Sequence, residues 1–434
     1  GIQQNVDYAY PAWVEASKTS MDVMKKYMDK DQQVKLDYAS SYASIANYWK
    51  NRQGMIDALK QHKTAESKQK DEKAFQKWAS KKANKKYEDV IPVINNYYEN
   101  TNKASAHDNY LGLLLRTRMA TIPYRLGNSI DYYLQQNEAK QAEVKPKLEA
   151  EINDLYEGIY MPLEKDVLAA QLKLYSTKAE NVAPLVARIA TANNKSEAGW
   201  NDYLNTAFEN SIFQSKEKLE AFMANPDAEV LKNDPLFQLS TDLLKRYRYE
   251  SEEEKHLKKD FERAYRLMVQ GMREMNPDAK YYPDANSTLR LTYGKVIALP
   301  EDKRNDAVKN YYTTLKGTIA KYQPGDDEFD MPKKLIDLYE KKDFGQYADD
   351  DGYLPVNFLT DNDITGGNSG SPVLNGKGEL IGLAFDGNIE AMAGDVIFDD
   401  QLQRTINVDI RYVLFLIDKF AGASHIIDEL TLAK

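Results

Sequence analysis

The sequence of 434 residues predicts an α+β protein, in which a large α-helical domain over residues 1–286 precedes a smaller, strand-containing domain over residues 287–434. Three observations support this prediction. Apolar residues return every three or four positions in the first part, a cluster of turn-forming residues follows, and short segments with strand-like alternation come after it. A block of helices followed by a block of strands indicates either an α+β arrangement or two separate domains.

The helical prediction for the first part depends on residue spacing and on helix punctuation. One predicted helix face consists of Val34, Tyr38, Tyr42, Ile45 and Trp49, and a second consists of Leu236, Leu239, Leu243, Leu244 and Tyr247. Pro235 fits the first turn of a helix, and the Asn-Pro pairs at 225–226 and 276–277 fit helix ends. We therefore expect several long antiparallel helices up to Met275.

The pattern changes at residues 281–286, a cluster of turn-forming residues where we place the domain boundary. Residues 288–293 then alternate in polarity and predict a strand. A short helical segment is expected within residues 303–321.

The last part of the chain predicts short strands and a closing helix. The strands are expected at residues 353–359, 371–374 and 379–385. Asn375 and Gly376 predict a tight hairpin between the last two strands, because both residues tolerate the positive φ that such a turn demands. The closing helix is predicted from the spacing of Ile410, Val413, Leu414 and Ile417.

Composition argues against several classes of function. A formal net charge of −9 at pH 7 disfavours a nucleic-acid partner, because phosphate binding depends on clustered Lys and Arg. The Lys-rich run at residues 63–86 is the local exception, and we interpret it as a solvated helix face because acidic and polar residues alternate with the lysines. Cysteine is absent, and the four histidines do not stand at ligand spacing, so we expect neither a metal nor another cofactor.

The chain contains no apolar run of the roughly 18 residues that a membrane span requires, and no signal sequence stands at its start. We therefore expect no membrane span. Two interpretations of the compartment stay open: a cytosolic protein, or a protein whose signal-bearing segment is missing.

The most chemically informative segment is residues 365–373, where glycines surround Ser369 just before a predicted strand. In acyl transfer, a serine hydroxyl must reach a carbonyl carbon while backbone N–H groups point at the developing oxyanion. Glycines permit the backbone turn that supplies both. The alternative interpretation is an ordinary Gly/Ser-rich loop.

The string from Gly367 to Pro372, Gly-Asn-Ser-Gly-Ser-Pro, resembles the nucleophile motif of the chymotrypsin clan, with Asn368 where many members have Asp. Further segments resemble the bacterial serine dipeptidyl peptidases 7 and 11. These segments are residues 46–50, 282–290, 380–394, 403–406 and 408–412. The resemblance thus extends over nearly the whole chain.

This resemblance implies a fold and a set of site residues. In the family, a large helical domain that covers the active-site cleft interrupts a chymotrypsin-like double β-barrel, and this chain is similar to the helical domain followed by the C-terminal half of the barrel. The resemblance makes Ser369 the nucleophile and the amides of Gly367 and Ser369 the oxyanion hole. It makes Asp386 the carboxylate that holds the free α-amino group of the peptide, with Asn47 assisting from the helical domain.

Alternative interpretations remain open for two of these residues. Asp386 could cap the hairpin, and Asn47 could be an ordinary polar helix residue. Gly387 stands where the family has arginine in the enzymes that cleave after acidic residues. Glycine there implies an apolar side-chain pocket and a preference for aliphatic or aromatic residues before the cut, as in the dipeptidyl peptidase 7 type.

A serine triad also needs a histidine and a carboxylate. None of His62, His107, His256 and His425 matches the family's catalytic-histidine motif, so we expect both partners upstream of Gly1, in a missing N-terminal barrel half. The chain alone should then lack normal peptidase activity.

The resemblance further implies oligopeptide substrates with a free N-terminus, a homodimer, and a periplasmic or secreted location. The alternative function is a non-catalytic helical protein that binds peptides or a partner. A metal hydrolase is disfavoured, because the sequence contains no His-Glu-x-x-His string.

Overall fold

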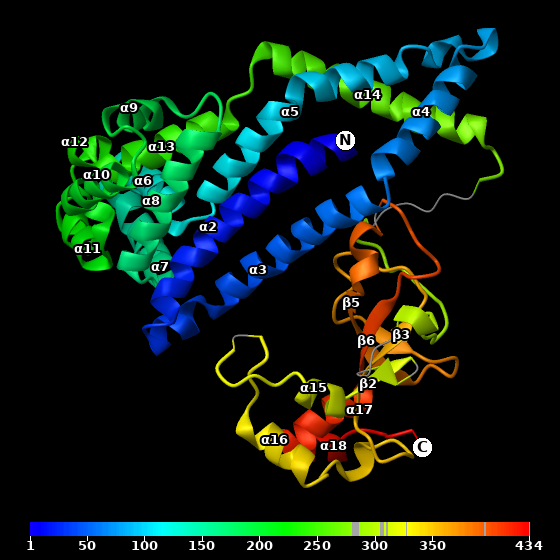
Figure 1. The fold of residues 1–434 in the computed structure, drawn as a ribbon. Helices are drawn as coiled ribbons and strands as arrows, with labels where there is room; N and C mark the ends of the chain where they lie inside the picture. Colours follow the sequence, from blue (N-terminus) through cyan, green and yellow to red (C-terminus); the bar gives the residue numbers. More distant parts are fainter. Residues whose placement is uncertain (280–285, 304–307, 310, 327, 395, 434) are drawn as a thin grey trace. The chain divides into compact units, whose positions relative to one another are not determined.

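The computed structural model describes residues 1–279, 286–303, 308–309, 311–326, 328–394 and 396–433. The chain divides into two compact units, Gly1–Lys280 and Tyr281–Lys434, which are considered separately (Figure 1). Of the turn-forming cluster predicted at the boundary, residues 281–285 lie outside the described part, so the predicted turn remains a prediction.

The first unit consists of helices, as the residue spacing predicts. Its elements are α1 (Ile2–Gln4), the π-helical turn η1 (Asn5–Ala9), α2 (Tyr10–Met28), α3 (Gln32–Gln61), α4 (Thr64–Ala79), the 3₁₀ segment η2 (Lys82–Tyr87), α5 (Val90–Leu114), α6 (Arg118–Leu134), α7 (Glu138–Tyr156), α8 (Met161–Lys178), α9 (Pro184–Ala192), α10 (Glu197–Asn210), η3 (Ile212–Gln214), α11 (Lys216–Ala224), α12 (Ala228–Asn233), α13 (Pro235–Arg248) and α14 (Glu252–Met275). The predicted helix ends before Pro226 and Pro277 are confirmed at Ala224 and Met275.

The largest apolar core of this unit lies among α2 and the helices α5 to α13, where Trp200 and Tyr175 are fully buried. Asp234 caps α13 by accepting hydrogen bonds from the backbone N–H groups of Leu236 and Phe237, which places Pro235 in the first turn as predicted. Helices α5 and α14 pack against each other beside α4 (Figure 1), and this group has its own smaller core.

The second unit contains one antiparallel sheet with short helices. Its strands are β1 (Val308–Lys309), β2 (Tyr312–Thr314), β3 (Pro355–Thr360), β4 (Pro372–Leu374), β5 (Leu380–Gly387) and β6 (Thr405–Asp409), in the spatial order β1-β2-β3-β6-β5-β4. Its helical elements are η4 (Glu301–Lys303), α15 (Leu315–Ile319), α16 (Lys333–Glu340), η5 (Gly345–Tyr347), η6 (Ile389–Ala393), α17 (Ile410–Phe415), the π-helical turn η7 (Leu416–Phe420) and α18 (Ser424–Asp428). The predicted strands at 353–359, 371–374 and 379–385 and the closing helix are confirmed.

One strand prediction for this unit is wrong. Residues 288–293 form no strand, and Leu291 and Tyr293 are 88% and 86% exposed. Alternating polarity is not sufficient, because a strand also needs a neighbouring strand to receive its backbone hydrogen bonds. The short helical segment expected within residues 303–321 is confirmed at α15, and Tyr312, Thr313 and Thr314 just before it pair with β3.

The hairpin between β4 and β5 exists, but its turn differs from the prediction. Gly378, with φ +80°, is the residue in the left-handed region, whereas Asn375 and Gly376 are not. The Gly378 N–H donates to the Asn375 carbonyl at 3.0 Å, and the Asn375 side chain accepts from the Lys377 and Glu379 N–H groups. The turn is therefore longer than a two-residue hairpin.

Candidate active site

The loop that carries Ser369 connects β3 to β4 and is hydrogen-bonded to β5. The Gly370 N–H donates to the Ala384 carbonyl at 2.7 Å, and the Ala384 N–H donates to the Ser371 carbonyl at 2.9 Å. Gly367 and Gly370 have φ of +108° and +83°, a region that disfavours any residue with a Cβ atom. These glycines turn the chain so that Ser369 lies exposed next to the strand.

The groups around the Ser369 hydroxyl fit part of a nucleophile site. The hydroxyl donates to the Phe385 carbonyl at 3.0 Å, and a backbone carbonyl cannot take up its proton as a general base must. Neither the Gly367 nor the Ser369 N–H donates a hydrogen bond to any residue that the structure describes. Two N–H groups without acceptors, on exposed residues of the loop that carries the serine, could contribute to an oxyanion hole.

Asp386 and Gly387 form the end of β5, directly after the carbonyl that binds Ser369. They pair with Ile406 and Thr405 of β6, and the register shifts between Ala384 and Asp386. The exposed Asp386 carboxylate accepts the Gly387 N–H at 2.7 Å. The alternative that Asp386 caps the hairpin is wrong, because the side chain of Asn375 occupies that role.

The helical turn η6 limits the space available for a side chain at position 387. A Cβ atom at this position would lie 2.7 Å from the Cβ of Ala391 and within 4 Å of no other atom outside its chain neighbours. Substitution of Gly387 by any larger residue therefore requires η6 to move. Sequence reasoning missed Ala391, because its importance arises only from this contact.

Asn388 and Arg404 hold η6 in place, and neither role follows from the sequence. The Asn388 N–H donates to the Arg404 carbonyl at 3.0 Å, its side-chain amide donates to the Leu402 carbonyl at 2.8 Å, and its side-chain oxygen accepts the Arg404 N–H at 2.8 Å. The guanidinium of Arg404 is buried and donates to backbone carbonyls, including those of Gln401 at 3.0 Å and Gln403 at 2.7 Å. The only signal was that residues 380–394 and 403–406, which contain Asn388 and Arg404, belong to segments that resemble the dipeptidyl peptidases.

Asn47, the remaining predicted site residue, lies in the helical unit. It is an exposed residue of α3, and its side chain makes no hydrogen bond with the described residues. The structure therefore leaves both interpretations of Asn47 open.

Within the described part of the second unit, no histidine hydrogen-bonds to Ser369, and the one histidine of that unit, His425, lies on α18. His62, His107 and His256 belong to the helical unit. Within the same described ranges, no three His, Asp or Glu side chains cluster as a metal site would require. The arrangement can present a serine and an oxyanion hole, but it contains no described base.

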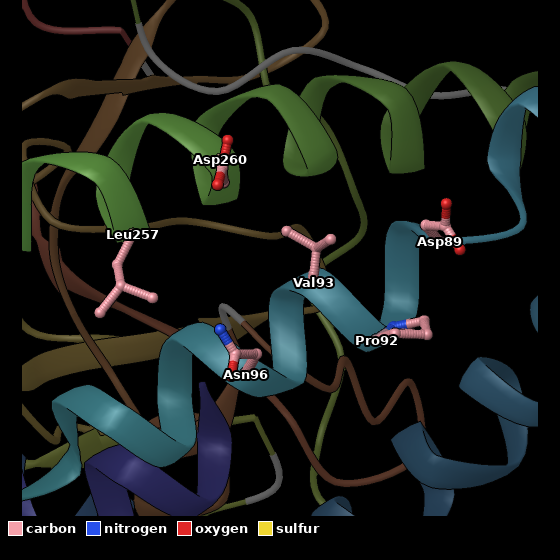
Figure 2. Close-up of a pocket in the computed structure, with 6 residues that line it drawn as sticks. All are labelled: Asp89, Pro92, Val93, Asn96, Leu257 and Asp260. Atoms are coloured by element: carbon pink, nitrogen blue, oxygen red, sulfur yellow. The ribbon is translucent and has the colours of Figure 1, made fainter. Parts of the chain in front are cut away.

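An open hollow of about 340 Å³ lies in the helical unit, between α5 and α14 (Figure 2). Val93 and Asn96 of α5, Leu257 and Asp260 of α14, and Asp89 directly before α5 are among the residues that line it. None of these lining residues belongs to the Ser369 loop or to β5. The hollow is therefore a feature of the helical unit considered by itself.

Comparison with known proteins shows the family of the chain. The profile of the peptidase S46 family matches residues 1–432. The chain is 53% identical to the dipeptidyl-peptidase 7 of Capnocytophaga gingivalis over 436 residues, which cover 99% of this chain and 60% of that protein. It is 35% identical to the Asp/Glu-specific dipeptidyl-peptidase of Flavobacterium psychrophilum, with coverage of 99% and 60%.

The solved structures that match this chain include those of a dipeptidyl peptidase. The crystal structure of Porphyromonas endodontalis DPP11 in complex with the dipeptide Arg-Glu matches with a TM-score of 0.87 at 30% identity, covering 99% of this chain and 61% of that one. Among the described residues, no helix combines the length and the apolar character that crossing a membrane requires. The chain spans 52% to 60% of the length of the dipeptidyl-peptidase 7 relatives it matches. Taken together, the matches show that this chain belongs to the peptidase S46 family.

Proposed function

We propose that this chain supplies the nucleophile and the amine-binding carboxylate of a serine dipeptidyl peptidase. In this proposal, the complete enzyme releases dipeptides from the free N-terminus of oligopeptides. The observation that carries it is the hydrogen bond from Ser369 to Phe385, which places the serine beside Asp386. The curated relatives of the same family that match nearly the whole chain are dipeptidyl peptidases.

The proposed nucleophilic step uses three groups of the loop. The Ser369 oxygen attacks the scissile carbonyl carbon, and the N–H groups of Gly367 and Ser369 stabilise the oxyanion that forms. The proton must pass to a histidine oriented by a carboxylate, and we place both outside these 434 residues, in the first half of a double β-barrel upstream of Gly1. The chain alone is then inactive.

The proposed recognition step uses the end of β5. The Asp386 carboxylate is exposed and makes no ion pair with the described residues, so it is free to pair with the α-ammonium of a peptide. Gly387 leaves the adjacent side-chain space without a charge, which suits an aliphatic or aromatic residue before the cut. Asn47 assists from the helical unit in this proposal.

The resemblance to the dipeptidyl peptidases supports three proposals about the complete protein. The sheet of the second unit is part of the C-terminal half of a chymotrypsin-like double β-barrel. The helical unit covers the active-site cleft. The enzyme is a periplasmic or secreted homodimer.

A fluorophosphonate probe tests the nucleophile and the missing base together. We expect weak labelling of Ser369 in this chain, because no base activates its hydroxyl. A chimera that joins the upstream region of the Capnocytophaga gingivalis dipeptidyl-peptidase 7 to this chain should label strongly. The labelling should disappear in Ser369→Ala and persist in Ser371→Ala, the matched loop control.

Two results would contradict the proposal. Strong, Ser369-dependent labelling of the chain alone would mean that a local base exists. A folded chimera that labels no better than the chain alone would mean that Ser369 is not the nucleophile of a completed triad.

A further inference from the structure

The helical unit contains a segment in which positive charge is concentrated. Residues 73–87 include six lysines and no acidic residue, although the whole chain has a net charge of −9. The six lysines, which are all exposed, are Lys73, Lys77, Lys81, Lys82, Lys85 and Lys86. We name residues 73–87, which comprise the end of α4 and all of η2, the lysine tip.

The backbone of the lysine tip is fixed by aromatic packing beneath it. Trp78 and the fully buried Tyr87 lie with their ring centroids 5.1 Å apart, and the Asn84 side chain donates to the Trp78 carbonyl at 2.9 Å. Helix α14 packs closely against the same group, because a Cβ on Gly271 would lie 2.7 Å from the Phe75 ring. The tip is therefore a rigid support for its lysines, unlike a mobile basic tail.

Helix geometry places the lysines on the side opposite this packing. In α4, Lys73 and Lys77 stand four residues apart on one face, whereas Phe75 and Ala79 of the same helix are buried. Lys81 follows the helix in an extended conformation and is also exposed. In η2, Lys82 and Lys85 stand three residues apart, and such residues eclipse each other in a 3₁₀ helix. The lysines therefore form one basic surface.

Most of this charge is not compensated within the chain. Lys86 pairs with Glu274 at 3.2 Å and lies over the Tyr87 ring. The other five lysines form no ion pair with any residue that the structure describes. Acidic residues resume only at Glu88 and Asp89, and Asp89 lines the hollow shown in Figure 2.

We propose that the lysine tip binds the anionic headgroup layer of a phospholipid membrane. An extended layer of phosphates can contact several lysines at once, and each lysine near such a surface contributes about fivefold to binding. The tip has no arginine for bidentate contacts with bases, and Phe75 and Tyr87 are buried and cannot stack on them, which disfavours nucleic acid. No large apolar side chain of the tip is exposed, so binding is superficial and reversible by salt.

Vesicle co-sedimentation of the full chain tests this proposal. We expect binding to vesicles of phosphatidylglycerol and phosphatidylcholine in equal parts, no binding to phosphatidylcholine alone, and loss of binding between about 0.05 M and about 0.5 M salt. The triple variant Lys77→Gln, Lys81→Gln, Lys82→Gln should bind about 100-fold more weakly.

The matched control changes three lysines of α7, which have glutamate neighbours at Glu143 and Glu149. Lys140→Gln, Lys145→Gln, Lys147→Gln removes the same charge and should leave vesicle binding within about twofold of the unmodified chain. Equal losses in the two triple variants would overturn the proposal, because net charge alone would then explain binding.

A footprint on the unmodified chain makes the test independent of variant folding. Bound vesicles should protect Lys81, Lys82 and Lys85 from acetylation more than Lys145 and Lys147. The proposal is wrong if the tip lysines acetylate equally with and without vesicles. It is also wrong if a single-stranded oligonucleotide of equal phosphate concentration displaces the chain from the vesicles, because the tip would then favour nucleic acid.

Discussion

His107 should make the stability of the helical unit depend on pH. Its side chain lies within α5, is only 2% exposed, and packs beside the Tyr175 ring with centroids 5.5 Å apart. Burial lowers the pKa of His107 from its usual 6.5 to about 4, and the charge of Arg246 acts in the same direction. Glu180 and Glu254 oppose this shift without cancelling it.

The sign of the effect follows from which state binds the proton more readily. The unfolded chain protonates His107 near pH 6.5, whereas the folded chain does so only near pH 4. The contribution to stability is therefore complete above pH 6.5 and is lost as the pH falls toward 4. The loss amounts to about 2 kcal/mol at pH 5 and about 3 kcal/mol below both pKa values.

Urea unfolding at pH 7.5 and pH 5, followed by tryptophan fluorescence, measures this loss. Fluorescence isolates the helical unit, because all four tryptophans, Trp13, Trp49, Trp78 and Trp200, belong to it. On acidification, the unmodified chain should lose about 2 kcal/mol more than His107→Leu, which cannot bind the proton. His256→Leu, at an exposed position of α14, should behave like the unmodified chain. An identical pH dependence in the unmodified chain and His107→Leu would refute the reasoning.

Three further predictions concern Asp386, Gly387 and Asp234. In the chimera, Asp386→Asn should lower kcat/KM for peptides with a free N-terminus about 10- to 100-fold, because a charge-assisted hydrogen bond contributes about 1.5 to 3 kcal/mol. An unchanged kcat/KM would exclude Asp386 from amine binding. Gly387→Arg should suppress cleavage after Leu, and the added change Ala391→Gly should improve cleavage after Asp by relieving the contact with η6. Kinetics on paired Leu and Asp substrates measure both effects. Unaffected cleavage after Leu would mean that Gly387 does not line the pocket. Asp234→Ala should lower the free energy of unfolding of the helical unit, measured in urea, by about 3 kcal/mol, because the buried carboxylate accepts hydrogen bonds from Ser211, Ile212 and the start of α13. Asp227→Ala, at an exposed helix cap, should lower it by only about 1 kcal/mol, and equal losses would contradict this difference.

The sequence predicts elements well where local chemistry and burial agree. Helix α13 is an example, because Pro235 and the capping Asp234 stand directly before an apolar stripe that becomes buried. Residues 288–293 show the limit of such patterns, since their alternation has no strand to pair with. The strand β2 forms although the sequence did not predict it. Its pairing with β3 joins residues more than 40 positions apart, which a pattern of neighbouring residues cannot reveal.

In the candidate site, too, the sequence points to some residues, whereas others become apparent only in the structure. Ser369 and Asp386 could be singled out as candidates, because the roles proposed for them belong to side chains that appear in short motifs. Asn388 and Arg404 could not, because they act mainly through backbone carbonyls that the letters of a sequence do not reveal. Ala391 could not be predicted either, because it matters only through its distance from Gly387.

Under the proposed function, the strand β5 sets the length of the released peptide. The loop before β4 is hydrogen-bonded to Ala384 and Phe385, and Asp386 follows in the same strand. The separation between the nucleophile and the amine-binding carboxylate is therefore fixed by backbone geometry, with a rise of about 3.3 Å per residue. In the same proposal, side-chain selectivity is set separately at Gly387, whose space is limited by Ala391 of η6. Mutations that enlarge or charge the pocket should consequently change which residue precedes the cut but not the number of residues released, since only a shift of Asp386 along the strand would change that number.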